Sequence, residues 1–307
     1  MTKIRSTDAS NIDDVRGQGG GGGGFGSGGF PFPLPGGGGG GGGGLPFPTK
    51  AGGGLMTILL LLAAMFLPKI LGRSQQAVGT VSNDQSGEVA NGTCSSDLEQ
   101  IVCGVTNDVQ DYWTAALPRF FGRQYEMTKT KLFTDGVNTG CGQATSQTGP
   151  FYCPLDNLVY LDLGFMQQLE TMLVGQTSDL AEQYIVAHEY GHHVQNVLGT
   201  NAQVQQAQQQ DPSNANRYSV ALELQADCYA GAWVGDVARR GLLDNADEIS
   251  EALKAAEGVG DDRIQMKTQG GIDRSSWTHG SAAQRQQWFQ RGFDTQDPRQ
   301  CNTFNDV

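Results

Sequence analysis

The stretch from Tyr184 to Gln195 constrains the fold of this chain most, because it contains the pattern His188-Glu189-x-x-His192. On an α-helix, residues four positions apart lie on one face, so both imidazoles can reach a single ion. Glu189 places its carboxylate beside that ion, where it can accept a proton from a metal-bound water. The pattern therefore predicts a helix that carries two zinc ligands and a general base. The alternative is a helix with two surface histidines, since short motifs also occur by chance.

The neighbouring residues indicate where this helix begins and ends. Asp179 followed by Glu182 forms a candidate capping pair, and Gly199 after Leu198 is a candidate C-terminal stop. Gly191 inside the helix costs on the order of 1 kcal/mol relative to alanine. That cost suggests that the metal or another helix approaches closely at this position.

A catalytic zinc site needs a third protein ligand, and Glu223 is the candidate. Glu223 and Asp227 are again four residues apart, so one carboxylate can bind zinc while the other holds a ligand imidazole. Small residues on the same stretch would let this second helix pack closely on the first; they are Ala226, Ala230, Gly231 and Ala232. A solvated acidic pair on a helix face is the alternative.

Several segments of the chain share a likeness to one known family. They are His188-Glu-Tyr-Gly-His-His193, Glu223-Leu-Gln-Ala-Asp-Cys-Tyr-Ala-Gly231, Thr278-His-Gly-Ser-Ala-Ala-Gln-Arg285, Cys141-Gly with Gly149-Pro-Phe-Tyr-Cys153-Pro, and Val159-Tyr-Leu-Asp162. From about Cys94 to the C-terminus the chain resembles the bacterial putative neutral zinc metallopeptidase family, and Asn11-Ile-Asp-Asp14 resembles the N-terminal tail of that family. More remotely it is similar to small gluzincins, in which the glutamate of an E-x-x-x-D helix is the third zinc ligand.

The resemblance implies a fold and a reaction class, but no particular substrate. The expected fold is a helix-rich α+β, zincin-like metallopeptidase domain with a small sheet. The expected cofactor is one Zn²⁺ per chain, held by His188, His192 and Glu223.

His279 is the one histidine outside the motif, and it precedes an expected helix that contains Gln284 and Arg285. Hydrolysis builds negative charge on the carbonyl oxygen, and a donor aimed at that oxygen stabilises the transition state. Gluzincins commonly supply a His or Tyr from a later segment, so the resemblance makes His279 a candidate catalytic residue. Two alternatives remain, a reversible fourth ligand of the resting enzyme and a helix-capping histidine bonded to backbone.

Three segments of different composition precede the domain. Residues 1–54 contain the glycine runs Gly19–Gly24 and Gly36–Gly44 and are predicted to be a disordered Gly/Pro-rich tail. Leu55–Leu71 has seventeen mostly apolar residues, the lower limit for a bilayer span, and is predicted to be a single-pass membrane anchor. Residues 72–92 form a predicted polar stalk, and residues 93–307 form the metallopeptidase domain.

All six cysteines follow the predicted anchor; they are Cys94, Cys103, Cys141, Cys153, Cys228 and Cys301. An even number on one side of the anchor suggests disulfides in an oxidising compartment. Fifteen connectivities are possible, and pairing of the near neighbours leaves Cys228 with Cys301. The alternative is six reduced thiols in a cytosolic domain. Because the flanking charges do not orient the anchor, the cysteines are the reason to place the domain outside the cytoplasmic membrane of a bacterial cell.

Two further segments are expected to border the site. Apolar residues from Leu98 to Leu117 recur at helical spacing and predict an amphipathic helix. Leu158–Leu163 has the pattern of a strand just before the motif helix, and in gluzincins a strand in this place borders the cleft and can pair with an extended peptide. The net charge of −12, without a basic stripe, argues against nucleic-acid binding.

These observations together favour a membrane-anchored, zinc-dependent peptidase with Glu189 as general base. Its expected partners are a peptide or protein substrate and the membrane, and the sequence leaves the oligomeric state open. An alternative from another class is a catalytically silent, zinc-stabilised module that binds envelope proteins. Glu189 argues against that module, because a structural zinc site has no use for the carboxylate. A structural surface protein with an incidental motif would be unaffected by a chelator.

Overall fold

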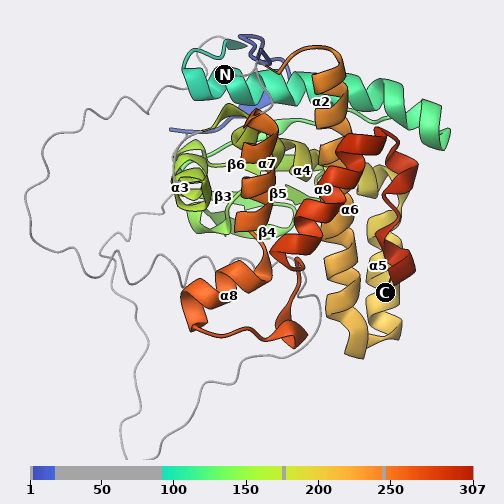
Figure 1. Cartoon of the computed structure of the whole chain (residues 1–307). Helices are drawn as coiled ribbons and strands as arrows, with labels where there is room; N and C mark the ends of the chain where they lie inside the picture. Colours follow the sequence, from blue (N-terminus) through green and yellow to red (C-terminus); the bar gives the residue numbers. More distant parts are fainter. Residues whose placement is uncertain (1–2, 18–91, 175–177, 244–246, 307) are drawn as a thin grey trace, which may run out of the picture.

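The computed structural model describes residues 3–17, 92–174, 178–243 and 247–306 (Figure 1). The predicted anchor, the glycine runs of the predicted tail and the stalk up to residue 91 lie outside these ranges. Within the described part of the chain, no helix combines the length and the apolar character needed to cross a membrane.

Helices form most of the described structure. They are α2 (Asp97–Phe121), α3 (Leu163–Val174), α4 (Asp179–Leu198), α5 (Thr200–Gln210), α6 (Ala215–Arg239), α7 (Asp247–Gly258), α8 (Asp261–Gln269) and α9 (Ala282–Thr295). Helix α6 packs against both α4 and α9, while α2 and α7 pack on α4 (Figure 1). The motif helix is therefore central, in contact with helices that come from distant parts of the chain.

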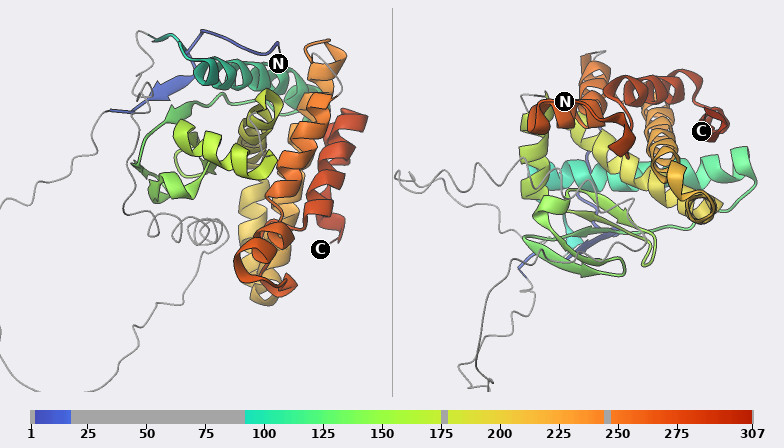
Figure 2. Two further views of the ribbon diagram at one scale, coloured as in Figure 1. Left: turned by 60° about the vertical axis from the view of Figure 1, so that its left-hand side comes forward. Right: turned by 90° about the horizontal axis from the view of Figure 1, so that it is seen from below.

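A small sheet lies on one side of the helices (Figure 2). Its strands, in spatial order, are β1 (Ile12–Asp14), β2 (Thr130–Leu132), β6 (Leu158–Leu161) and β5 (Phe151–Cys153), and β3 (Gly136–Thr139) and β4 (Gly142–Thr145) form a separate two-stranded sheet. β2 is parallel to β1 and β6, and β5 is antiparallel to β6. The expectation of a helix-rich α+β fold with small sheets is confirmed.

The strand expected beside the cleft is β6, and its place in the sheet differs from the expectation. β6 is paired with β2 on one side and with β5 on the other, so its backbone groups are already used. β5 is the last strand of the sheet at this end, and both β5 and β6 contact α4. The outer strand at this end of the sheet is therefore β5 and not the predicted strand.

Helix α4 has the predicted bounds, but a different residue caps it. The N-cap is Ser178, whose hydroxyl accepts a hydrogen bond from the backbone amide of Ala181 at 3.3 Å. Asp179 is instead the first helical residue, where its carboxylate faces Arg5. Gly199 ends the helix at φ 82°, a left-handed conformation that favours glycine.

Glycines mark the closest contacts between helices. A Cβ on Gly191 would lie 3.1 Å from backbone atoms of Ala226, so the expected close approach is made by α6. A Cβ on Gly231 would lie only 2.0 Å from the carbonyl oxygen of Phe289 in α9. Ala226 thus packs on the motif helix as expected, whereas Gly231 serves the contact between α6 and α9.

The helix expected around Leu98–Leu117 is α2, which begins with a capping box. Ser96 accepts a hydrogen bond from the Glu99 amide, and the Glu99 carboxylate accepts one from the Ser96 amide. Fully buried apolar side chains of α2, including Val105, Val109 and Trp113, enter the main core. Their burial explains the helical spacing of apolar residues in this segment.

Residues 3–17 belong to the folded domain, although the sequence places them in the predicted tail. β1 extends the sheet by pairing with β2, with Ile12 opposite Thr130. Ile4 and Ala9 are each 5% exposed. The composition of the glycine runs does not extend to these first residues, which pack on α2, α4 and β2.

Three disulfides connect the six cysteines: Cys94–Cys103, Cys141–Cys153 and Cys228–Cys301. This is the connectivity that follows from pairing near neighbours. The Cys228–Cys301 bond joins α6 to the C-terminal segment after α9. It is therefore the one that ties the candidate site to the end of the chain.

Candidate metal centre

The structure brings together His188 and His192 from α4 and Glu223 from α6. One ligand atom from each of these buried residues lies within 4.8 Å of the others. The Nε2 atom of His188 is 3.2 Å from one Glu223 oxygen, and the Nε2 atom of His192 is 3.5 Å from the other. Two ligands bound to zinc at 2.0–2.1 Å in a tetrahedron are about 3.3 Å apart. The two separations between imidazole and carboxylate therefore match the spacing of ligands around one zinc ion.

Hydrogen bonds on the far side of each imidazole fix the orientation of the two rings. The Nδ1 atom of His188 is 2.9 Å from Asp227, and the Nδ1 atom of His192 is 2.8 Å from the side-chain oxygen of Gln195. If each Nδ1 carries the proton, it donates to that oxygen and leaves the Nε2 lone pair free. Metal-binding histidines are commonly held in this way. Asp227 thus lies where the sequence places it, beside a ligand imidazole.

Arg285 of α9 holds the Asp227 carboxylate with two hydrogen bonds, at 2.7 Å from Nε and 2.8 Å from Nη2. The Tyr184 hydroxyl donates to the same carboxylate at 2.6 Å. Burial alone would raise the pKa of Asp227, but the charge and hydrogen bonds of Arg285, together with His188, lower it to about 2. Asp227 is therefore an anion that orients His188.

Arg285 has a role that the sequence reasoning missed. Arg285 is 4% exposed, and an arginine is almost never buried unless it is paired with an opposite charge. The signal was present in the sequence, since Arg285 and Phe289 are four residues apart and therefore share one face of a helix. An arginine on the apolar face of a helix is a candidate for a buried ion pair, because a buried arginine is almost always paired.

A chain of amides connects His192 to the C-terminal segment. The side-chain nitrogen of Gln195 donates to the carbonyl of Leu222 at 2.7 Å and to the side chain of Gln225 at 3.1 Å. Gln225 in turn donates to the carbonyl of Cys301 at 2.9 Å. Because Cys301 is bonded to Cys228, this disulfide holds the outer end of the chain in place.

The electrostatics of the site favour a bound cation. Burial would lower the pKa of His188, but the Asp227 and Glu223 carboxylates outweigh it and raise the pKa to about 10. Burial likewise opposes a charge on His192, and Glu223 outweighs it, so the pKa of His192 is also raised. The pKa of Glu223 is well below its usual value, against the effect of burial, because of the charges of His192 and His279. The carboxylates thus create a negative potential between the imidazoles, which a divalent ion would neutralise.

Glu189 lies next to these residues on α4 and is 8% exposed. Burial raises the pKa of its carboxyl group, the two ligand imidazoles oppose this, and Glu223 adds to it. A hydrogen bond from the backbone of Tyr152 places the carboxylate beside β5. A base with a raised pKa is better matched to proton transfer near neutral pH.

His193, which directly follows His192 in the sequence, contributes to the fold and not to the metal centre. Its Nδ1 atom is 3.1 Å from the hydroxyl of Tyr152, and its Nε2 atom is 2.6 Å from the carbonyl oxygen of Glu126. Burial lowers the pKa of His193, so the neutral ring is favoured. The ring connects α4 to Tyr152 of β5 and to the backbone at Glu126.

His279 is buried in a turn that one carboxylate organises. An oxygen of Asp261 accepts hydrogen bonds from three successive backbone amides, those of Thr278 at 2.8 Å, His279 at 2.7 Å and Gly280 at 3.0 Å. The other oxygen is 3.2 Å from Nδ1 of His279. Gly280 has a φ of 85°, which a side chain would strain.

This turn brings His279 close enough to Glu223 for its charge to lower the pKa of that carboxylate. Among the described residues, the group that could share one ion contains His188, His192 and Glu223, and His279 is not part of it. The helix cap of α9 is Ser281, whose hydroxyl accepts from the Gln284 amide. The structure thus places His279 beside the metal centre and assigns the cap to another residue.

Two imidazoles one helical turn apart, a carboxylate from a second helix and a glutamate beside the first imidazole form the donor set of a zinc hydrolase. The chain belongs to the family described as Putative neutral zinc metallopeptidase, whose model matches residues 1–304.

Relatives of this chain occur in distant bacteria. The uncharacterized protein YpfJ of Escherichia coli (strain K12) is 39% identical over 265 residues, which cover 84% of this chain and 88% of that protein. The uncharacterized protein Rv2575 of Mycobacterium tuberculosis (strain ATCC 25618 / H37Rv) is 45% identical over 215 residues, 66% of this chain and 70% of that protein. No solved structure matches the chain.

Proposed function

We propose that this protein is a zinc-dependent peptidase. The observation that carries the proposal is the convergence of His188, His192 and Glu223 within 4.8 Å, with the buried Glu189 beside them. The donor spacing, the orientation of both rings and the sign of the potential all fit one Zn²⁺, and the family description agrees.

Each residue of the site then has a distinct task. A zinc ion held by the three ligands would act as a Lewis acid on the peptide carbonyl and would lower the pKa of the attacking water to about 7. Glu189 accepts the proton of the water during attack and passes it to the leaving nitrogen. His279 donates a hydrogen bond to the carbonyl oxygen as negative charge develops there.

We further propose that the substrate is an extended peptide or protein segment that pairs with β5. This strand ends the sheet and lies beside Glu189, so a peptide added there would present its carbonyl groups to the site. A nucleic acid is a poor candidate, because the chain has a net charge of −12.

The domain is proposed to act at the bacterial cell membrane, outside the cytoplasm, with Leu55–Leu71 as the membrane attachment. Support for the compartment comes from the three disulfides, since such bonds persist in oxidising environments. Support for the attachment comes from the apolar composition of Leu55–Leu71.

The test of this function is Glu189→Gln, which preserves size and hydrogen bonding but removes the base. We expect zinc content to remain and peptide turnover to fall by about 10²–10⁴-fold, the usual contribution of a general base. The control is Glu126→Gln, the same chemical change at an exposed side chain, which should leave turnover unchanged. Wild-type turnover in Glu189→Gln would reject the peptidase and favour the silent zinc-stabilised binding module.

A further inference from the structure

The N-terminal segment, residues 3–16, is held to the domain by main-chain hydrogen bonds along much of its length. The amide of Ser6 donates to the carbonyl of Gln100, and the amide of Thr130 donates to that of Asn11. At the end of the segment, the amide of Val15 donates to Leu132 of β2. The last two bonds extend the ladder between β1 and β2, and the first ties the segment to α2, so the segment is part of the domain.

A buried ion-pair cluster fixes the same segment. Arg16 is 2.7 Å from Asp14 and 2.6 Å from Glu99, the glutamate of the α2 capping box. Arg16 is 9% exposed and Glu99 is 2% exposed. A buried charge requires a partner of opposite charge, and Arg16 is the cation that pairs with the Glu99 carboxylate.

The segment also supports the helix that carries the metal ligands. Gln183 of α4 donates from its side-chain nitrogen to the carbonyl of Ile4 at 3.0 Å, and Arg5 is 2.9 Å from Asp179 at the start of α4. The backbone of Ile4 and Arg5 lies so close to α2 that a Cβ on Gly104 would meet it at 2.8 Å. Glycine at this position is what allows the segment to pack there.

This packing constrains how the chain can meet a membrane. The segment ends at Gly17 and the domain resumes at Gly92, with Leu55–Leu71 between them. A single crossing at Leu55–Leu71 would place residues 3–16 and the domain in different compartments. β1 could not then pair with β2, and Glu99 would lose Arg16.

We propose that residues 3–16 and the peptidase domain lie on the same side of the membrane, so that Leu55–Leu71 attaches to the membrane without crossing it as a single span. Two crossings would require about 40 apolar residues, and the connection contains one mostly apolar stretch of seventeen. The chain therefore makes no net crossing of the membrane between β1 and the domain while β1 is paired with β2. The inference concerns attachment and is independent of the catalytic chemistry.

The first test maps both ends of the full-length protein in intact cells. Thr2→Cys and Asn305→Cys are labelled separately with a membrane-impermeant maleimide, before and after the cells are opened. The six native cysteines are bridged and do not react. We expect both variants to be labelled under the same condition. Labelling of one variant before opening and of the other only after opening would overturn the proposal.

The second test detects the paired strand directly. Asp13 and Lys131 are register partners, and their side chains are 3.0 Å apart. Asp13→Cys combined with Lys131→Cys is treated in membranes with a short bismaleimide, and the chain is then cut at a protease site inserted in the glycine run 36–44. We expect the two fragments to remain joined.

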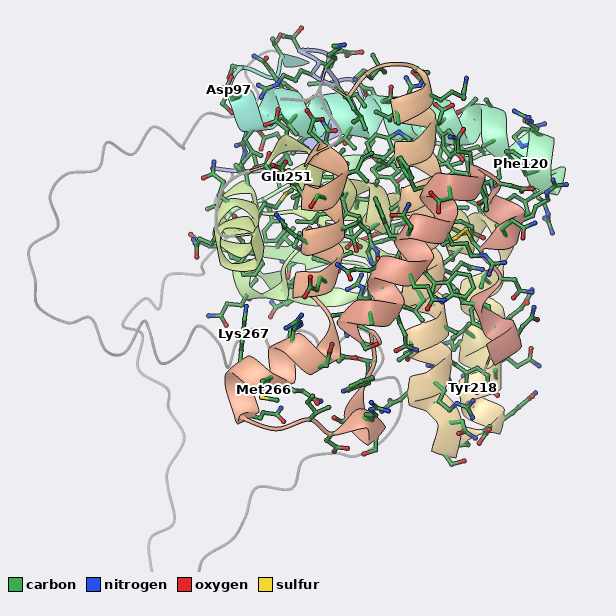
Figure 3. All side chains as sticks on the ribbon, in the orientation of Figure 1. Asp97, Phe120, Tyr218, Glu251, Met266 and Lys267 are labelled. Carbon is green, nitrogen blue, oxygen red and sulfur yellow. A yellow bond between two sulfur atoms is a disulfide. The ribbon has the colours of Figure 1, made fainter. Side chains whose placement is uncertain are left out.

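The matched control is Asp13→Cys with Met266→Cys. Met266 is 52% exposed and lies on α8, at the opposite end of the molecule from Asp97 of α2 (Figure 3). We expect no joined fragments from this pair. If Asp13→Cys with Lys131→Cys gave no joined fragments either, the docked strand would be rejected, whatever the labelling of the two ends showed.

Discussion

The two halves of helix α4 are held by different kinds of contact. Around its metal ligands, charged and amide side chains fix each ring, as in the hydrogen bond between His188 and Asp227. At its beginning, α4 contacts the N-terminal segment through a bond from Gln183 to the main-chain carbonyl of Ile4 and through the ion pair between Asp179 and Arg5. Contacts between side chains depend on the identity of both residues, whereas a bond to a main-chain carbonyl requires only that the backbone of the N-terminal segment lies in the right place. The first therefore leaves a motif in the sequence, and the second leaves almost none.

Among the side chains around the metal ligands, removal of Arg285 should reduce stability most. Arg285→Ala leaves Asp227 buried without its main countercharge, which typically costs about 3–5 kcal/mol of unfolding free energy. Denaturant unfolding measures this loss. Arg291→Ala on the same helix removes an exposed guanidinium and should cost far less.

A double replacement separates stability from metal binding at the same place. Asp227→Leu with Arg285→Leu removes both charges, so much of the stability should return. His188 would still lack its orienting carboxylate, and zinc affinity should remain about 10–100-fold weaker. Recovery of both stability and zinc affinity would show that Asp227 does not position His188.

Replacement of His279 tests whether the side chains around the metal ligands also take part in catalysis. His279→Ala should lower kcat by about 10²–10³-fold with normal zinc content, as for loss of one donor to the carbonyl oxygen. Steady-state kinetics and elemental analysis on the same preparation measure the two quantities. Higher activity would indicate a resting-state ligand instead, and unchanged kinetics with unchanged zinc would leave His279 with a structural role alone.

The attachment of the N-terminal segment is best examined through the ion pair between Arg16 and Glu99 of α2 and its dependence on pH. Burial alone would raise the pKa of Glu99, but hydrogen bonds from the Ser96 amide, Arg16 and Ser95 lower it to about 2, from an ordinary 4.5. A pKa that is lower in the folded state adds stability above pH 4.5, and this stability is lost as the pH falls towards 2.

Arg16→Ala should therefore cost about 1.5–3 kcal/mol near neutral pH, the usual value for a hydrogen bond to a charged group. The cost should shrink in acid, because protonated Glu99 no longer needs a cation. Unfolding free energies of both proteins across this pH range provide the measurement. A cost that stayed constant with pH would show that Arg16 acts by packing and not by charge.

The contrast between the halves also explains what could be predicted. The extent of α4, the core face of α2 and the spacing of His188 and His192 follow from local spacing, whereas Cys228–Cys301 follows only if the other four cysteines pair with their near neighbours. Arg285 could have been recognised from its helical spacing to Phe289, as a charge on an apolar face. The Asp261 turn could not, because its carboxylate reaches amides that are 17–19 positions away and have no side-chain signature.

The N-terminal strand was hidden for a different reason. Ile12, Asp13 and Asp14 stand next to a glycine-rich segment, and a three-residue strand has too few residues to show an alternating pattern. Its partner β2 is more than a hundred positions away in the sequence. The register depends on the parallel pairing with β2, which no local feature specifies.

Zinc content tests the central claim most directly. The purified wild-type domain should bind one zinc ion per chain, and Glu189→Gln should keep it, because that carboxylate is a base and not a ligand. Glu223→Ala, like His188→Ala, should lose most of its zinc after dialysis against a weak chelator, since two ligands remain. Elemental analysis that found equal zinc in the wild-type protein and Glu223→Ala would contradict the proposed metal centre.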